Sequence, residues 1–392
     1  MDSLIAANIS QRPLRTAISI IGVALGVVLV TLFVGLARGM MRDSARRQSN
    51  VDAEVRFLPG GNISLAGNPL MLQQRYADAI LHGVQPTADD PDIEPKPPIP
   101  GVVATSAVGE YVQNSVAGFG FEMVDGLDFK SFIQCTHLNL TKGRPLGDGQ
   151  TPGTEYEAIV DRYYSESAKD VDGKPIQLGS RITVLGHVFT IVGIYEPSLL
   201  ARVKIPLHTM QQLLGGTENC TFVMVKCERP EQADGVIEQL RRYYPGNHVI
   251  ATSEIPALYT QGLAPVEVFL DVVIGFGLVI SVLVILLAMY TTIIERTREI
   301  GILKSLGASK RFIVLTIEKE AALMSAMGVV LGFIAAILGK LWLEANTRLL
   351  VELEPKWLVI AALIGIFGGV VGAIYPALRA ANLDPVEAIS YD

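Results

Sequence analysis

The sequence predicts an α-helical membrane protein with four transmembrane helices plus a large extracytoplasmic α+β domain inserted between helices 1 and 2. Three observations predict this fold class. Four apolar segments reach the length of about 20 residues that a helix needs to cross a bilayer. The segment between the first two has short alternating runs separated by turn residues, as small strands and helices do. Half of the residues are hydrophobic and 18% are charged, which is typical of a membrane protein with a substantial soluble part.

Each apolar segment is expected to form one transmembrane helix. The first is too long for the apolar core of a secretory signal, and no small-x-small cleavage site follows it before Arg38, so we interpret it as an uncleaved signal anchor. The predicted spans are residues 17–37, 266–294, 321–341 and 357–377.

Basic residues before the first span and after the fourth predict that both termini are cytoplasmic, because short cationic segments resist translocation. Four arginines after the first span argue the other way, but they lead into a long domain, and long domains cross largely regardless of charge. We therefore expect residues 38–265 outside the cytoplasm, residues 342–356 as an outer loop and residues 378–392 as a cytoplasmic tail. The four arginines are Arg38, Arg42, Arg46 and Arg47.

Residues 1–16 are expected to form a cytoplasmic amphipathic helix. Leu4, Ile5 and Ile9 recur there at helical spacing, and Pro13 then opens the turn into the first span.

The outer segment carries the patterns of a mixed domain. A strand over 221–226, a helix over 231–244 and a strand near Val249 predict a small β-α-β unit packed on one sheet face. A β-hairpin is expected over 181–195, and another helix over 69–81. The hairpin turn is expected at Gly186-His187.

Residues 83–101 hold six prolines and four acids, so we expect a solvated loop that cannot bury enough apolar surface to order itself. A partner-binding arm is the alternative interpretation.

Glycines recur four residues apart in the spans, which lets membrane helices approach closely. We interpret them as packing positions, within one subunit or between two; a role in substrate contact is the alternative interpretation. They are Gly22, Gly26, Gly328, Gly332, Gly365, Gly368, Gly369 and Gly372.

The sequence lacks the motifs of several common enzymatic and binding sites. There is no P-loop, no Gly-x-Ser-x-Gly elbow, and no metal-ligand spacing among the five histidines. Cys135, Cys220 and Cys227 make no Cys-x-x-Cys motif, and we favour three thiols over a disulfide between the last two. The net charge of −7 argues against a nucleic-acid binder. We predict no catalytic, metal or nucleotide site in this chain.

Residues 295–320 join the second and third spans and are the most informative segment. Ile300, Leu303 and Leu306 lie about one helical turn apart, which predicts a short amphipathic helix suited to docking into a cleft of a soluble partner. A linker that lies along the membrane is the alternative. The five cations that mark this segment as cytoplasmic are Arg296, Arg298, Lys304, Lys310 and Arg311.

The order of these residues resembles the coupling loop of the MacB/FtsX-like (type VII) ABC permeases, a family that includes LolC and LolE. The matching phrase is Glu295-Arg296-x-Arg298-Glu299-Ile300-Gly301-Ile302-Leu303-Lys304-x-Leu306-Gly307-Ala308-Ser309. The closing phrase of the family is matched by Tyr375-Pro376-Ala377-x-Arg379-Ala380-Ala381-x-Leu383-Asp384-Pro385-Val386-Glu387-Ala388-Ile389. Residues 38–265 also resemble the periplasmic core domain of the MacB group.

The resemblance implies a permease subunit without a fused ATPase in the bacterial inner membrane. Two copies of a separate ATPase would bind ATP and Mg, and a second permease subunit would complete a homo- or heterodimer, so no cofactor is expected in this chain. An adaptor protein, an outer-membrane channel and membrane lipid are further candidate partners. The implied function is export of a lipoprotein, lipid, peptide or drug; the alternative is an FtsX-like regulator that moves an extracytoplasmic enzyme and transports nothing.

The resemblance also implies which residues receive the push of the ATPase. Glu299 and Lys304 would make polar contacts, Leu303 would be the apolar anchor, and the glycines would allow close approach. The coupling residues are Glu295, Arg296, Arg298, Glu299, Ile300, Gly301, Leu303, Lys304, Leu306, Gly307 and Ala308.

Overall fold

A computed structural model describes residues 13–61, 70–85, 95–114, 121–261, 264–347 and 349–384. The chain divides into two compact units. Met1–Met40 and Ala264–Asp392 form the first, called here the helical unit, and Met41–Leu263 form the second, called the sheet domain. Most of the predicted helix over residues 1–16, the centre of the proline-rich segment, and the end of the predicted tail lie outside the described residues.

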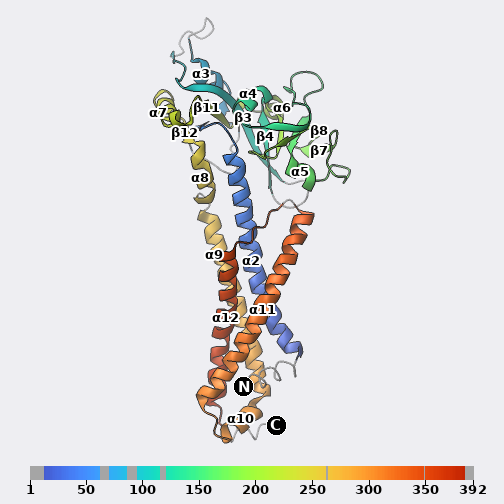
Figure 1. The fold of residues 1–392 in the computed structure, drawn as a ribbon, viewed down its shortest axis with the longest axis vertical. Helices are drawn as coiled ribbons and strands as arrows, with labels where there is room; N and C mark the ends of the chain where they lie inside the picture. The colour runs from blue at the N-terminus through green and yellow to red at the C-terminus, as the bar shows by residue number, and fades with distance from the viewer. Residues whose placement is uncertain are drawn as a thin grey trace. The chain divides into compact units, whose positions relative to one another are not determined.

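Long helices build the helical unit (Figure 1). Among the described residues, four helices are long and apolar enough to cross a membrane, as the sequence predicts. The helices extend beyond the predicted apolar segments, because polar residues at their ends continue the same pattern of backbone hydrogen bonds. The bounds are α2 Pro13–Ser49, α9 Ala264–Glu295, α10 Thr297–Ser305, α11 Lys310–Asn346 and α12 Pro355–Asn382.

Glycines let these helices approach to backbone contact. A Cβ on Gly332 of α11 would lie 2.8 Å from the Val27 side chain of α2, and one on Gly372 of α12 would lie 2.5 Å from the Val282 carbonyl oxygen of α9. The predicted packing role is confirmed at these positions, and the contacts are made within one chain.

The connection between α11 and α12 crosses the backbone of α2. The Glu352 amide donates a 3.0 Å hydrogen bond to the Gly35 carbonyl oxygen. A Cβ on Gly39 would lie 2.1 Å from the Leu350 carbonyl oxygen. The two glycines therefore form a seat for this connection, which buries Val351 to 2% exposure.

A ten-stranded mixed sheet organises the sheet domain, in the order β12-β1-β11-β3-β4-β9-β6-β8-β5, with β7 paired to β8. The pairs β4/β9 and β6/β8 are parallel and the other pairs are antiparallel. The strands are β1 Val55–Leu58, β3 Val102–Asn114, β4 Phe121–Leu127, β5 Asn139–Gly143, β6 Glu157–Asp161, β7 Arg181–Val184, β8 His187–Glu196, β9 Val203–Pro206, β11 Phe222–Cys227 and β12 His248–Ala251.

Short helices and a second, two-stranded sheet complete this domain. The small sheet pairs β2 Leu72–Gln73 with β10 Asn219–Cys220. The helices are α3 Tyr76–His82, α4 Phe129–Gln134, α5 Arg162–Ser167, α6 Leu207–Leu214, α7 Ala233–Tyr243 and α8 Ile255–Gln261, with 3-10 turns at Pro230–Gln232 and Thr252–Glu254.

The predicted β-α-β unit is present as β11, α7 and β12, although β1 inserts between its two strands. The helix predicted over 69–81 is wrong in its first half. It begins only at Tyr76, because Leu72 and Gln73 pair as a strand with residues far away in the sequence.

The predicted hairpin is formed by β7 and β8, but its turn lies one residue earlier than predicted. Val184 pairs with His187, so Leu185 and Gly186 are the two turn residues. Their φ angles of 50° and 78° are both positive, as the type I′ turn of a two-residue hairpin requires. His187 was wrongly placed in the turn because a leucine rarely adopts a left-handed conformation.

The three cysteines are buried thiols, as predicted. Burial raises the pKa of Cys135 and of Cys220 to about 12, so both stay protonated near neutral pH.

Candidate coupling site

The helix α10 sits between the long helices α9 and α11 and contains most of the predicted coupling residues. Arg296 separates it from α9 with non-helical angles of −107° and 15°. The Thr297 hydroxyl donates back to the Ile293 carbonyl oxygen at 3.0 Å, which holds the first turn of α10 against the end of α9. Ile300 is 8% exposed and packs in the apolar core of the helical unit.

Charged contacts tie the start of α10 to α11. Arg296 forms a 2.8 Å ion pair with Glu299 of α10 and a 3.5 Å ion pair with Glu320 of α11. Glu320 is only 6% exposed, so this arginine reaches into the packed interior and does not lie along the surface. This ion pair therefore joins the residue before α10 to α11.

A lysine ties the other end of α10 to α12. The Lys304 ammonium group donates to the carbonyl oxygens of Ala381, at 3.0 Å, and of Leu383. Ala381 is in the last turn of α12 and Leu383 is the residue after it. Carbonyl oxygens at the end of a helix lack intrahelical N–H partners, so the Lys304 ammonium supplies a donor for them. Lys304 therefore contacts its own chain, so its predicted role toward the ATPase stays a prediction.

Gly307 ends α10 in a Schellman motif. The Ala308 amide donates to the Leu303 carbonyl oxygen and the Gly307 amide donates to the Lys304 carbonyl oxygen, both at 3.0 Å. Gly307 has a φ of 93°, which favours glycine, and no described atom lies within 4 Å of a Cβ placed there. The positive φ explains why glycine is favoured at position 307. Close packing against another part of this chain does not explain it.

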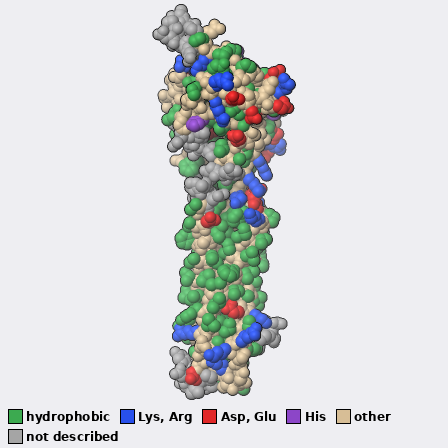
Figure 2. All heavy atoms as spheres, turned by 90° about the vertical axis from the view of Figure 1, so that its left-hand side faces the viewer, with side chains coloured by type: hydrophobic (Ala, Val, Ile, Leu, Met, Phe, Trp, Pro, Cys, Tyr) green, Lys and Arg blue, Asp and Glu red, His purple; other side chains and the backbone are tan. Residues whose placement is uncertain are grey.

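The outward side of α10 mixes apolar and charged groups. The three apolar residues predicted to lie on one face of α10 do not share the same burial. Ile300 is buried, whereas Leu303 is 42% exposed and Leu306 is 79% exposed. Glu299 is also exposed, with 59% of its side chain accessible. In Figure 2, Lys and Arg side chains gather at the end of the helical unit, below a largely hydrophobic surface. The surface of α10 and of the residue after it therefore presents exposed apolar and charged side chains.

Glu267 and Asp271 lie near the start of α9, far along this helix from α10. Asp271 is exposed near the start of α9, and the side chain of Glu267 lies outside the described residues.

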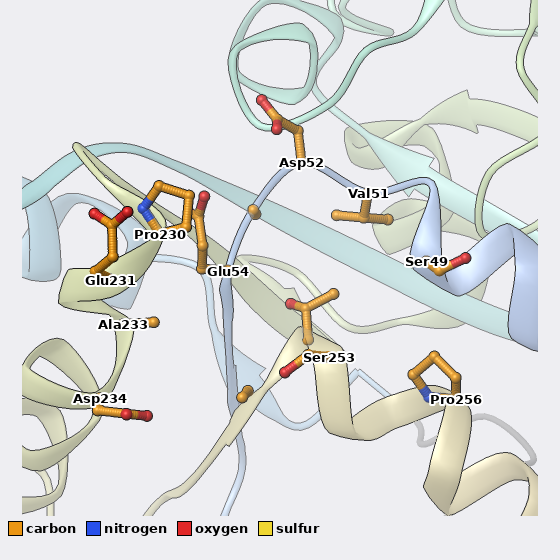
Figure 3. Close-up of a pocket in the computed structure, with 13 residues that line it drawn as sticks. Ser49, Val51, Asp52, Glu54, Pro230, Glu231, Ala233, Asp234, Ser253 and Pro256 are labelled. Atoms are coloured by element: carbon orange, nitrogen blue, oxygen red, sulfur yellow. The ribbon is translucent and has the colours of Figure 1, made fainter.

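The sheet domain has a separate groove of about 650 Å³, shown in Figure 3. Its walls are the segment after α2, the first turn of α7 and the start of α8. Two of its carboxylates are already paired, because Lys226 lies 2.8 Å from Asp52 and 3.1 Å from Glu54. We assign no ligand to this groove.

Comparison with known proteins identifies the family. The model of the MacB-like periplasmic core domain matches residues 16–243, and the model of the FtsX-like permease C-terminal domain matches residues 272–385. The chain belongs to the MacB/FtsX-like family of ABC transporter permeases. Helix α10 lies inside the FtsX-like match.

Relatives cover nearly the whole chain at low identity. The uncharacterized ABC transporter permease YknZ of Bacillus subtilis is 22% identical over 98% of this chain and 97% of its own length. The pyoverdine export ATP-binding/permease protein PvdT of Pseudomonas syringae pv. tomato is 24% identical over 96% of this chain. The macrolide export ATP-binding/permease protein MacB of Campylobacter jejuni is 22% identical over 98% of this chain. This chain spans 57% of PvdT and 60% of MacB.

Sequence reasoning missed three groups that hold α10 or α2 in place. Glu320 was interpreted as a residue at the membrane interface and was not counted among the coupling residues, and Gly35 and Gly39 were not singled out. The four-residue spacing of these glycines at the end of the first span was the available signal.

Proposed function

We propose that this permease couples ATP hydrolysis by a separate ATPase to motion of the sheet domain, for export of a periplasmic or membrane-derived substrate. The observation that carries the proposal is the exposed surface of α10 and of the residue after it. Leu306 is 79% exposed there, and Arg298 and Glu299 are exposed about two helical turns earlier. A soluble partner that covers this surface would gain apolar burial at Leu306 and charge complementarity at Arg298 and Glu299.

The attachments of α10 support a coupling role. Arg296 links its start to Glu320 of α11, and Lys304 links its end to the last turn of α12. A partner that pushes on α10 would therefore move α9, α11 and α12 together, since α10 is also joined to α9 by one residue. A flexible linker along the membrane would lack such attachments at both ends.

The surroundings of the protein follow from the same proposal. Helix α10 and both termini would face the cytoplasm of a bacterial inner membrane, and the sheet domain would be periplasmic. Two ATPase copies carrying ATP and Mg would bind a pair of permease subunits. The names of PvdT and MacB describe export, which favours export over FtsX-like regulation as the role of this chain.

Replacement of Leu306 by glutamate tests the docking face. The tagged full chain would be purified in gentle detergent from its own cells, and its partners identified by mass spectrometry. We expect wild type to recover an ATPase, and Leu306→Glu to reduce the recovered ATPase and its hydrolysis at least about tenfold, because a charge replaces about 2 kcal/mol of apolar burial.

The matched control is Leu178→Glu, the same change at a leucine of the sheet domain that is 46% exposed. It should recover wild-type amounts of the ATPase. Equal recovery with Leu306→Glu would contradict docking on α10. Recovery of an ATPase with a cell-wall hydrolase would support the FtsX-like role instead, and recovery of no ATPase with wild type would overturn the proposal.

A further inference from the structure

The last turns of α2 are gripped by a single loop of the sheet domain. The Arg47 side chain donates to the Leu200 carbonyl oxygen, and the Leu200 amide donates back to the Arg47 carbonyl oxygen at 3.2 Å. The Asn50 side-chain amide, one residue beyond α2, donates to the Ser198 carbonyl oxygen at 2.7 Å. Residues 198–202, which connect β8 to β9, are therefore bound to α2 from several sides.

Arg202 extends this grip into the sheet. Its guanidinium lies 2.7 Å from Asp43 on α2 and 2.7 Å from Asp161 at the end of β6. Asp43 in turn pairs with Arg47 at 3.0 Å. Arg202 is 15% exposed and Asp161 is fully buried, so the ion-pair chain from α2 to β6 is largely shielded from water. Together these residues form a unit that we call the α2 anchor: Asp43, Arg47, Asn50, Asp161 and Arg202.

The loop that grips α2 is itself fixed to the sheet. The buried Lys204 ammonium of β9 lies 2.7 Å from Asp125 of β4 and donates to the carbonyl oxygens of Leu199, at 3.0 Å, and of Ala201, at 2.9 Å. The Tyr195 hydroxyl of β8 also donates to Ala201 at 2.9 Å. Three strands thus hold the loop in one conformation.

A buried ion pair is weak evidence for added stability, because replacing it with well-packed apolar residues often leaves the free energy of unfolding unchanged or higher. Their distinctive property is directional, since a guanidinium bonded to two carboxylates fixes both angle and distance. An apolar contact would let α2 slide or turn against the sheet, whereas Arg202 allows one arrangement only.

We propose that the α2 anchor transmits motion of α2 to the sheet domain, with Arg202 as the positioning residue. This inference rests on the proposed function, in which an ATPase moves the helices. It names the joint through which the sheet domain would follow them, and it requires no group beyond those the chain supplies.

Two variants of the full chain break the joint in different ways. Asp43→Asn removes the carboxylate of α2 that pairs with Arg202, and it leaves the pair of Arg202 with the buried Asp161 intact. Arg202→Met removes both pairs. The matched control is Arg162→Met, which breaks ion pairs of an arginine that is 62% exposed in the same domain.

Hydrogen exchange of the permease–ATPase complex gives two separate readouts. Without nucleotide, we expect both anchor variants to speed exchange at residues 43–50 at least tenfold, with β4 and the control unchanged. With MgATP compared with MgADP, the wild type should show a nucleotide-dependent change in the sheet domain. Both variants should lose this nucleotide-dependent change. They should still support ATP hydrolysis, whereas a misfolded permease would not.

The outcomes separate the two proposals. Unaltered exchange at residues 43–50 in both variants would overturn the anchor, whatever the ATPase does. A nucleotide-dependent change that survives in both variants would overturn its role in transmission. Absence of any nucleotide-dependent change in the wild-type complex would overturn the proposed function and this inference with it.

Discussion

The same helix is held by different physical means in the two units of the molecule. In the helical unit, Gly35 and Gly39 bring the backbone of α2 against the backbone of the connection between α11 and α12. In the sheet domain, Asp43 and Arg47 hold α2 through ion pairs and charge-assisted hydrogen bonds. The change occurs between Gly39 and Asp43, which is about one helical turn.

This difference follows from what each environment tolerates. A charged side chain is costly inside a bilayer, whereas small residues cost nothing there and let van der Waals contacts form. A sheet domain can bury charges once strands on several sides supply partners, as Arg202 and Lys204 show. The helical unit should therefore be sensitive to added volume, and the sheet domain to charge and pH.

The largest effect is expected from volume at the glycine seat. A Cβ at Gly39 would lie 2.1 Å from the Leu350 carbonyl oxygen, which is backbone and cannot rotate away. We expect Gly39→Val to destabilise the seat by about 3 kcal/mol. Hydrogen exchange at the Glu352 amide, which bonds to Gly35, should then speed up about a hundredfold.

Gly275→Val on α9 is the matched control, because no described atom lies within 4 Å of a Cβ there. Both changes raise helix propensity slightly, so the control separates this gain from the clash. Equal exchange at Glu352 in the two variants would show that the connection does not rest on Gly39.

An effect of similar size, confined to the sheet domain, is expected from Glu110 on β3. Burial, with the charge of Asp125 opposite it on β4, raises the pKa of this carboxyl group to about 7. The folded state therefore binds the Glu110 proton more tightly than the unfolded chain does. The contribution of protonated Glu110 to the free energy of unfolding should be complete below pH 4.5. It should fall by about 3 kcal/mol as the pH rises to 7.

Glu110→Gln should abolish this slope, since a neutral amide has no proton to lose. Opening free energies of β3 and β4 amides, from hydrogen exchange of the full chain between pH 5 and 8, would measure it. Glu166→Gln, at a carboxylate that is 63% exposed, should keep the slope. A slope that persists in Glu110→Gln would assign it to another group.

The spans were predictable from sequence because length and hydropathy are local properties. The hairpin over 181–195 was predictable for the same reason, yet its turn was misplaced, since only the pairing of Val184 with His187 shows that Leu185 adopts a positive φ. The start of α3 was missed because Leu72 pairs with Cys220, which is far away in the sequence.

The candidate site divides in the same way. The apolar spacing of Ile300 and Leu306 predicted the helix α10, but which of the two faces inward depends on packing with α9 and α11. The α2 anchor was not predictable, because Asp43 and Arg202 lie 159 residues apart in the sequence. The arginines after the first span were noticed only as a conflict with the expected orientation.

The smallest expected effect compares two exposed glycines, Gly307 with a positive φ and Gly235 inside a helix. Gly307 has open space around its Cα and a φ of 93°, so Gly307→Ala should cost about 1 kcal/mol through backbone conformation alone. Gly235 in α7 also has open space but a helical conformation, so Gly235→Ala should gain up to about 1 kcal/mol. Exchange at the Ala308 amide, bonded to Leu303 in the Schellman motif, and at the amides of α7 would report these opposite signs. A gain at both positions would mean that the end of α10 does not require a left-handed residue. Its rigid presentation of Leu306 would then have to come from Lys304 and α12 alone.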